Sequence, residues 1–412
     1  AKACAELFRA RSADLDGIVV VLPNFGDEKG VADALRLSNL EIPVLVQAYP
    51  DDPDRLDPAS RRDAFCGKIS VCNNLRQYGI PFSLPSRHTA HPQSESFRAD
   101  LRQFAAVCRV VRGMRTVRIG AVGARPGAFN TVRYSEKILE RHGISITTVD
   151  FSEILASAAE LSGNENAMNA AMDGIRGYAA TDSVPDDKLR RIAGLDLALR
   201  RFVDDNALDA TAIQCWTSVQ ANQGCNACTS MSMMSENFRP SACEVDVTGA
   251  LTMYAMQLAS GSPSALVDWN NKCVLFHCGN WAKSFIPDAA VSTAPILGSI
   301  VGTDRTWGAL DGRAPAQPLT FGRVATDDTS GTLRAYIGEG ELTDDPLETF
   351  GNRAVARIPN LQGLMQYVCE HGFEHHVVMN ASHTARVLEE ALSRYLGWSV
   401  HVHASAREET LR

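Results

Sequence analysis

The N-terminal part of the chain alternates between short apolar runs and amphipathic stretches. Residues 17–22 and 43–47 are apolar and β-branched, and residues 28–37 between them carry apolar side chains at helical spacing. Strands of a parallel sheet are continuously apolar, because the helices that connect them cover both faces. The pattern therefore predicts a doubly wound, Rossmann-like α/β domain, which we assign to residues 1–112.

The same alternation restarts after a long helical pattern at residues 95–111. Strands are predicted at residues 117–122, 144–149 and 210–215, and helices at residues 132–142, 152–161, 186–207 and 250–258. Strands that alternate with helices of this length are typical of parallel βαβ units. We therefore predict a second Rossmann-like α/β domain at residues 113–258.

Beyond this point the pattern changes to short strands separated by Gly, Asp and Thr turns. The predicted strands are residues 264–267, 273–277, 319–324, 332–338 and 399–403, and a helix is predicted at residues 383–396. Short strands at this spacing favour an antiparallel sheet or barrel over another α/β unit. The prediction for residues 259–412 is a β-rich, barrel-like C-terminal domain.

Composition narrows the class of partner. The chain has 412 residues, of which 45% are apolar and 21% charged, and its net charge is -8. Nucleic acids and anionic membranes need a clustered basic surface, so neither is expected as a partner. The apolar runs are far shorter than the roughly 20 residues that cross a bilayer. We expect a small-molecule substrate and no membrane span.

Cysteine usage and the N-terminus bear on location. The chain begins without Met or a secretory leader, inside what resembles an amphipathic helix, so we expect leading sequence to be missing. Eleven cysteines, an odd number, favour free thiols in a reducing cytoplasm over a disulfide framework. Cys225 and Cys228 have the spacing of half a zinc site, but no second pair accompanies them, and we interpret them as structural.

Three residues far apart in the chain have the chemistry of one divalent-cation site. Glu244 precedes a predicted helix among small and apolar residues, Asp268 ends an apolar strand, and His376 lies in an apolar C-terminal stretch. Two carboxylates and an imidazole can hold a cation and leave coordination positions open for a substrate. Each residue also has an ordinary explanation, as a helix-start acid, a turn former or a structural histidine.

Two local expectations accompany this hypothesis. Asp246 or Thr248 is predicted to cap the helix that follows Glu244. If His375 and His376 lie in a strand, their side chains face opposite ways, and at most one points into a site.

The contexts of these residues resemble the L-fucose isomerase and L-arabinose isomerase superfamily, and they are most similar to its fucose isomerase branch. The similarity rests on Glu244, on Asp268 24 positions later, and on the motif from His376 to His383 with Leu388 after it. The resemblance implies two α/β domains before a β-rich domain. It also implies Mn2+ bound by Glu244, Asp268 and His376 together with the vicinal oxygens of a sugar.

The resemblance has one clear departure. The fucose enzymes have Asn-His-Gly where this chain has His375-His376-Val377, and the chain is shorter than those enzymes. The sugar is therefore left open, together with its chirality and phosphorylation state, and a modified sugar is among the expected substrates.

The resemblance and the ligand chemistry together predict a metal-dependent aldose–ketose isomerase that acts through a cis-enediolate. Glu244 and Asp268 are the predicted acid/base pair. Gln214, Trp216 and His277 are the candidate substrate-binding residues, although a buried amide, a packed ring and a support for the metal shell are their alternatives. The resemblance also implies a homotrimer or homohexamer.

Two other functions remain open at this stage. The same metal-stabilised enediolate leads equally to an epimerase, a decarboxylase or an enzyme that migrates a carboxyl group in a sugar acid. A sugar-binding regulator on the same scaffold is a third class, which the retention of all three ligand types disfavours.

Overall fold

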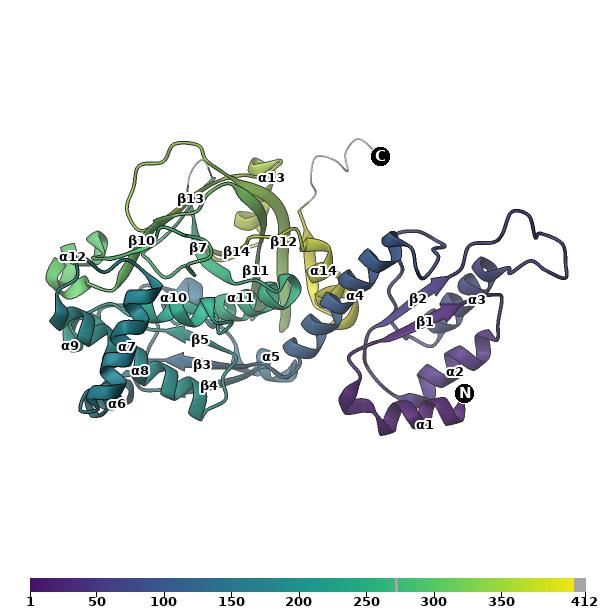
Figure 1. Ribbon diagram of the computed structural model, residues 1–412, viewed down its shortest axis with the longest axis horizontal. Helices are drawn as coiled ribbons and strands as arrows, with labels where there is room; N and C mark the ends of the chain where they lie inside the picture. The colour runs from purple at the N-terminus through teal and green to yellow at the C-terminus, as the bar shows by residue number, and fades with distance from the viewer. Residues whose placement is uncertain (271–272, 404–412) are drawn as a thin grey trace. The chain divides into compact units, whose positions relative to one another are not determined.

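The computed structural model describes residues 1–270 and 273–403, which form two compact units (Figure 1). Unit 1 comprises Ala1–Gly113 and Arg386–Trp398, and unit 2 comprises Met114–Ala385 and the chain from Ser399. The predicted second α/β domain and β-rich domain thus lie together in unit 2. Most of the helix predicted at residues 383–396 belongs to unit 1, although the sequence pattern had assigned it to the C-terminal domain.

Unit 1 is built on a two-stranded parallel sheet, as the alternating pattern predicts. The strands are β1 (Ile18–Leu22) and β2 (Val44–Ala48), and the helices are α1 (Lys2–Ala10), α2 (Glu28–Ser38), α3 (Ala64–Gln77) and α4 (Glu95–Met114). Helix α2 begins at Asp27, whose side chain accepts a hydrogen bond from the Gly30 amide, and it ends at Asn39 in the left-handed region. Every residue of β2 is buried.

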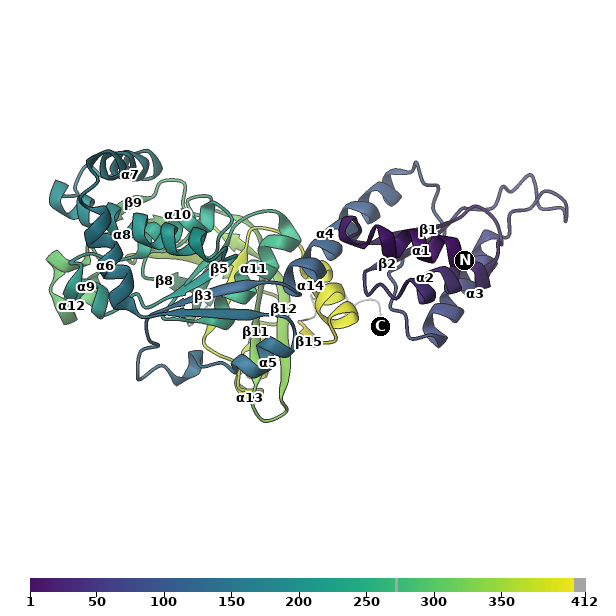
Figure 2. The same cartoon turned by 90° about the horizontal axis from the view of Figure 1, so that it is seen from below.

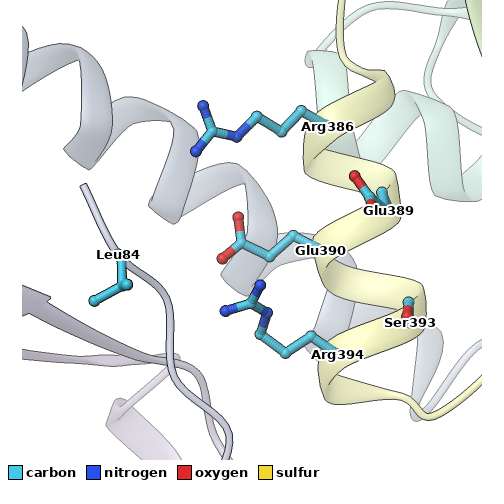
Figure 3. Close-up of a pocket in the computed structure, with 6 residues that line it drawn as sticks. All are labelled: Leu84, Arg386, Glu389, Glu390, Ser393 and Arg394. Carbon is cyan, nitrogen blue, oxygen red and sulfur yellow. The ribbon is translucent and has the colours of Figure 1, made fainter. Parts of the chain in front are cut away.

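The segment that returns to unit 1 late in the chain consists of α14 (Ala385–Glu389) and a π-helical turn (Glu390–Tyr395). The Tyr395 hydroxyl lies 2.7 Å from Ser83 Oγ and donates to the Val44 carbonyl, so this segment is tied to the edge of the sheet. Figure 3 shows Arg386, Glu390 and Arg394 extending from one side of this helix toward Leu84, where they line a polar cavity.

The first part of unit 2 is a four-stranded, fully parallel sheet with the order β4-β3-β5-β6. Its strands are β3 (Arg118–Val122), β4 (Ser145–Val149), β5 (Ala210–Ile213) and β6 (Ser241–Cys243). The helices are α5 (Glu136–Arg141), α6 (Phe151–Leu161), α7 (Glu165–Tyr178), α8 (Asp186–Asp205), α9 (Ser218–Asn222), α10 (Cys228–Glu236) and α11 (Val247–Ser260). Figure 2 shows α6, α7 and α8 grouped together.

The second part of unit 2 is a mixed sheet of nine strands. They are β7 (Ser264–Asn270), β8 (Val274–His277), β9 (Ala290–Ser292), β10 (Ala309–Arg313), β11 (Gln317–Asp327), β12 (Thr332–Thr343), β13 (Asn352–Arg357), β14 (His376–Asn380) and β15 (Ser399–Val402), with helices α12 (Pro295–Val301) and α13 (Leu361–Glu370). Their order is β15-β12-β11-β14-β7-β8-β13-β10-β9, and β13 also pairs with β12. That extra pairing closes six of the strands into a ring, so the predicted barrel-like character is confirmed.

Helix α11 joins the two parts of unit 2. It packs against β5 and β6 of the parallel sheet and against β7, β11 and β14 of the barrel (Figure 1). Because both sides are covered, the helix is apolar around most of its circumference and nearly all of it is buried. Within residues 1–270 and 273–403, no helix combines the length and apolarity needed to cross a membrane.

The cysteines are free thiols throughout the chain. Cys225 and Cys228 are buried, and burial raises the pKa of both thiols, that of Cys225 to about 12. Buried neutral thiols of this kind behave as small apolar side chains. The structural interpretation of this pair fits that environment.

Candidate active site

Glu244 occupies a strained turn between β6 and α11. Glu244 and Val245 are consecutive residues in the left-handed region, with φ of 63° and 57°. Neither residue type favours that region, and each such residue costs on the order of 1–3 kcal/mol, so the surrounding structure must enforce it. The turn lies at the carboxyl end of the parallel sheet, where α/β proteins place their ligand sites.

His376 and Asp268 are brought together by strand pairing in the barrel. β14 runs antiparallel to β7, and the register sets His376 directly opposite Asp268. Residues in that relation have Cβ atoms about 5 Å apart, on the same face of the sheet. β8 pairs with the other side of β7, and His277 is its last residue.

The three predicted ligands converge on one nitrogen atom. His376 Nε2 lies 3.3 Å from Glu244 Oε2 and 3.5 Å from Asp268 Oδ1. Both oxygens are buried, and no hydrogen-bond donor reaches either of them from the described residues. Leaving a buried carboxylate oxygen without a donor is costly, so this point of the structure suits a cation, either the protonated ring of His376 or a metal ion that displaces its proton.

The opposite side of the His376 ring has very different surroundings. His376 Nδ1 lies 2.8 Å from Asp246 Oδ2. Asp246 accepts two further hydrogen bonds from the guanidinium of Arg323, at 2.6 and 2.8 Å, and one from the Gly249 amide at 2.9 Å. Asp246 is thus the predicted cap of α11 and, at the same time, the partner of the histidine.

These contacts set the pKa values of the cluster. Burial opposes protonation of His376, but the hydrogen bond to Asp246 and the nearby Glu244 carboxylate outweigh burial and raise its pKa to about 10. Although burial acts in the other direction, His376 holds the pKa of Glu244 below its usual value. Arg323 and His376 likewise overcome burial and hold the pKa of Asp246 well below its usual range.

His277 is buried beside the cluster in a defined tautomeric state. Its Nδ1 accepts a hydrogen bond from the Cys278 amide at 2.9 Å, so the neutral ring carries its proton on Nε2. Burial lowers the pKa of His277, which keeps the ring neutral near pH 7. Glu244, His277 and His376 are close enough to hold one ion, but a protonated Nε2 is a donor and not a ligand.

Trp216 and Gln214 lie on the chain that follows β5, next to the Glu244 turn. Trp216 Nε1 donates to Glu244 Oε1 at 3.2 Å, and its ring meets Phe129 edge to face at 5.5 Å. Gln214 Oε1 accepts from the Ala124 amide at 2.9 Å, which anchors the loop after β3. Trp216 therefore contacts the candidate ligand Glu244 directly, whereas Gln214 contacts the loop after β3.

The condition under which His375 and His376 would face opposite ways is not met, because only His376 lies in β14. His375 Nε2 lies 3.6 Å from Asp268 Oδ1, the same oxygen that His376 approaches. The alternation of side chains applies only inside a strand, and β14 begins at His376, so the residue before it is not constrained. Asp268, His375 and His376 form a second group close enough to hold an ion.

The donor atoms suit a divalent metal ion, but they fall into two groups. Among the described residues, Glu244, His277 and His376 lie close enough to share one ion, and so do Asp268, His375 and His376. The predicted ligands Glu244 and Asp268 thus belong to different groups that share His376. Carboxylate oxygens and imidazole suit Mn2+, Mg2+ or Fe2+ better than soft-ligand metals. Fold and cluster together define an α/β enzyme with a candidate cation site at the junction of a parallel sheet and a β-barrel.

Comparison with known proteins identifies the family. The N-terminal domain of the fucose/sulfoquinovose isomerases matches residues 1–115, and the C-terminal domain of L-fucose isomerase matches residues 275–403. The chain is 26% identical over 391 residues to a sulfoquinovose isomerase of Alkalicoccus urumqiensis, which covers 92% of this chain and 84% of that protein. The chain belongs to the fucose isomerase-like superfamily and is a sugar isomerase.

Two further relatives are also sulfoquinovose isomerases by name. A sulfoquinovose isomerase of Clostridium sp. (strain MSTE9) is 27% identical over 308 residues, which are 72% of this chain and 66% of that protein. One of Priestia megaterium is 24% identical over 246 residues, which are 57% of this chain and 54% of that protein. Because these relatives are named as isomerases, the hypothesis of a non-catalytic regulator finds no support.

Sequence reasoning missed Arg323 and assigned Asp246 only its capping role. A usable signal was present for Arg323, since it follows Leu319 and Phe321 at the period of two that marks the inner face of β11. A lone arginine on an apolar strand face needs a buried acid as its partner. Asp246, in a similarly apolar stretch, is that acid.

Proposed function

We propose that this protein is an aldose–ketose isomerase that uses Mn2+ or a similar divalent ion held by Glu244, Asp268 and His376. The observation that carries the proposal is the convergence of two donor-free carboxylate oxygens, Glu244 Oε2 and Asp268 Oδ1, on His376 Nε2. When bound there, the ion would polarise a carbonyl oxygen and the neighbouring hydroxyl of an open-chain sugar.

The two carboxylates would then move the proton. One removes it from the carbon that carries the hydroxyl, which leaves the enediolate of the substrate, and the other delivers a proton to the former carbonyl carbon. The hydroxyl oxygen loses its proton and the former carbonyl oxygen gains one, so the carbonyl and the hydroxyl exchange places and no redox cofactor is consumed. Glu244 approaches His376 from the turn after β6, in the α/β part, and Asp268 approaches it from β7 of the barrel. A sugar bound between the two carboxylates would be within reach of both.

Neighbouring residues have complementary roles in this proposal. His277 presents an N–H group that suits a substrate oxygen, because its Nδ1 is already engaged. The half-buried ring of Trp216 offers an apolar surface for one face of the sugar, while its N–H group fixes Glu244. Gln214 is assigned to anchoring the loop after β3.

For the substrate we propose a sulfonated aldose such as sulfoquinovose. Two observations support this substrate. The relatives are named sulfoquinovose isomerases, and the His375-His376-Val377 sequence departs from the fucose-type motif. Assembly as a homotrimer or homohexamer, supported only by resemblance to the superfamily, is part of the same proposal. So is a cytoplasmic location, which suits a chain whose cysteines are free thiols.

The decisive experiment follows the proton. Sulfoquinovose, fucose and other aldoses are incubated with the Mn2+-loaded protein in deuterated water and monitored by NMR. We expect conversion to the ketose with deuterium at the former carbonyl carbon, and we expect Glu244→Gln and Asp268→Asn to lose both conversion and exchange. Full activity in either variant, with an intact fold by circular dichroism, would exclude the assigned acid/base pair.

A further inference from the structure

A buried chain of charged groups lies behind His376, on the side away from the candidate ligands. Asp246, Arg323 and His376 are all essentially inaccessible to solvent, at 0%, 0% and 1% exposure. Arg323 also approaches Glu374 Oε2 through Nε at 3.3 Å. None of these groups takes part in the proton transfers proposed above, and among them only His376 is a proposed ligand.

Every lone-pair direction of Asp246 is occupied. Its Oδ1 accepts from the Gly249 amide at 2.9 Å and from Arg323 Nη2 at 2.8 Å, and Thr248 Oγ1 lies 3.3 Å away. Its Oδ2 lies 2.6 Å from Arg323 Nη1 and 2.8 Å from His376 Nδ1. Arg323 Nη2 donates in addition to Thr248 Oγ1 at 2.8 Å, so the fork of the guanidinium is fixed at both prongs.

Stability alone is a weak reason for such a pair. A buried ion pair loses about as much in desolvation as it gains in attraction, and an apolar pair of the same volume is often equally stable. What the pair does define is the tautomer and the orientation of the His376 ring. A carboxylate beside Nδ1 accepts a hydrogen bond from the proton on that nitrogen. The lone pair of the neutral ring is then on Nε2, the atom that Glu244 and Asp268 approach.

We propose that Asp246 and Arg323 are positioning residues that hold His376 in the tautomer and orientation needed to bind the metal ion. Asp246 acts on the ring directly, and Arg323 acts by fixing Asp246. The proposal rests on the metal centre of the proposed function, and its measurable quantity is the affinity for Mn2+ in the absence of any substrate.

The experiment measures free Mn2+ by electron paramagnetic resonance in titrations of the full chain. Asp246→Asn retains a side chain that caps α11 but removes the charge, and its dissociation constant for Mn2+ should rise roughly 10- to 100-fold, as for other partners of metal-bound histidine. Arg323→Lys keeps the charge but loses the fork, so its dissociation constant should rise by a smaller factor, about 3- to 10-fold.

A control is available in a second acid–arginine pair of unit 2, in which only the acid is buried. Asp196 is 2% exposed, and Arg200 Nε lies 2.8 Å from its Oδ2, with both residues on α8 and the arginine partly exposed. Asp196→Asn should disturb stability in a similar way and change the Mn2+ dissociation constant by less than about twofold, because α8 contributes none of the proposed ligands.

A double variant separates positioning from stability. Asp246→Asn with Arg323→Gln removes both charges of the pair, while Glu374 loses its contact with Arg323, so resistance to urea should recover in part relative to Asp246→Asn alone. Under the proposal its Mn2+ affinity stays as low as in the single variant. It also decides the matter if the single variant does not fold.

The outcomes are distinct. If the wild type binds Mn2+ and folded Asp246→Asn binds it within about twofold of the wild type, the positioning role is refuted while the proposed function stands. Recovery of Mn2+ affinity together with stability in the double variant also refutes it. Failure of the wild type to bind Mn2+ overturns the metal centre itself, and the positioning role with it.

Discussion

Glu244 and Asp246 are acids two positions apart in one turn, and they face opposite sides of the same imidazole. Both are buried, at 8% and 0% exposure, so burial does not distinguish them. Asp246 is enclosed by donors from Arg323 and from the backbone, whereas no donor of the described chain reaches Glu244 Oε2. The chain thus supplies hydrogen bonds to both oxygens of Asp246 but leaves Glu244 Oε2 without one, which is the difference expected between a supporting acid and the acid of the proposed cation site.

The largest expected effect is on the stability of the metal-free protein. Asp246→Ala leaves the Arg323 guanidinium buried without its main partner, and breaking such a pair costs about 3–5 kcal/mol of unfolding free energy. Glu244→Ala removes a carboxylate that accepts from Trp216 at Oε1 and has no hydrogen bond at Oε2, and we expect a loss of about 1 kcal/mol. Urea unfolding at pH 7 in the presence of a chelator measures both. Equal losses would show that the two acids are not differently embedded.

Metal addition should reverse the ranking of the two acids. At a concentration of about 100 times its dissociation constant, Mn2+ should raise the unfolding free energy of the wild type by about 2.7 kcal/mol. Glu244→Gln and Asp268→Asn should lose most of that increase, because each removes a ligand oxygen. Urea unfolding with and without Mn2+ makes the comparison, and Asp196→Asn should keep the full increase. An undiminished increase in Glu244→Gln would remove that residue from the ligand set.

The pH dependence follows from His376, whose pKa is raised to about 10. Below that pH the metal-free ring carries a proton on Nε2 that a metal ion must displace, so affinity for Mn2+ should rise by up to about tenfold per pH unit, or about 1.4 kcal/mol, between pH 7 and 9. The stability of the metal-free protein should change in the opposite sense. A raised pKa contributes stability that is fully present below the ordinary value of 6.5 and is lost as pH rises through about 10.

Titrations of Mn2+ binding and of urea unfolding over this pH range test both trends. Asp246→Asn should weaken both pH dependences, because its neutral amide favours the imidazolium less. Affinity for Mn2+ that is independent of pH would show that Nε2 is not the ligand atom.

The smallest predicted effect concerns Trp216. Trp216→Phe keeps the ring but removes the N–H group that reaches Glu244 Oε1 at 3.2 Å, and we expect a cost of about 1 kcal/mol, or about a fivefold loss in kcat/KM. Trp269→Phe is the matched control, since Trp269 follows Asp268 but donates to the Tyr336 hydroxyl on the other face of β7. Steady-state kinetics on the best substrate distinguishes the two. Equal losses would mean that the Trp216 contact does not organise the site.

Local patterns were sufficient for most elements and for the chemistry of the ligands. Short runs of apolar and β-branched residues predicted β1, β2, β3 and β4. The change to short strands separated by turn residues after α11 predicted the β-rich part. The same patterns do not specify which strands pair across long stretches of chain. The contact of His376 with Asp268 depends on pairing β14 with β7, more than a hundred positions earlier, and that register is decided by the closure of the whole barrel.

The double role of Asp246 shows a second kind of limit. Its position before α11 predicted a helix cap correctly, and that explanation was sufficient for an acid seen only in its local sequence. Arg323 is 77 positions away along the chain, so the pair exists only once β11 packs against α11. An arginine on the inner face of an apolar strand was the available sign of it.

The return of residues 386–398 to unit 1 limits how this protein can be recombined with its relatives. A chimera joined at residue 113 would pair one protein's β2 and Ser83 with another protein's Tyr395, since the tyrosine that hydrogen-bonds to this sheet is encoded nearly three hundred positions later. The match to the N-terminal family domain ends at residue 115, but the folding unit does not end there. Exchange of N-terminal units between these isomerases therefore requires three crossovers, after Gly113, Ala385 and Trp398, so that residues 386–398 are exchanged as well.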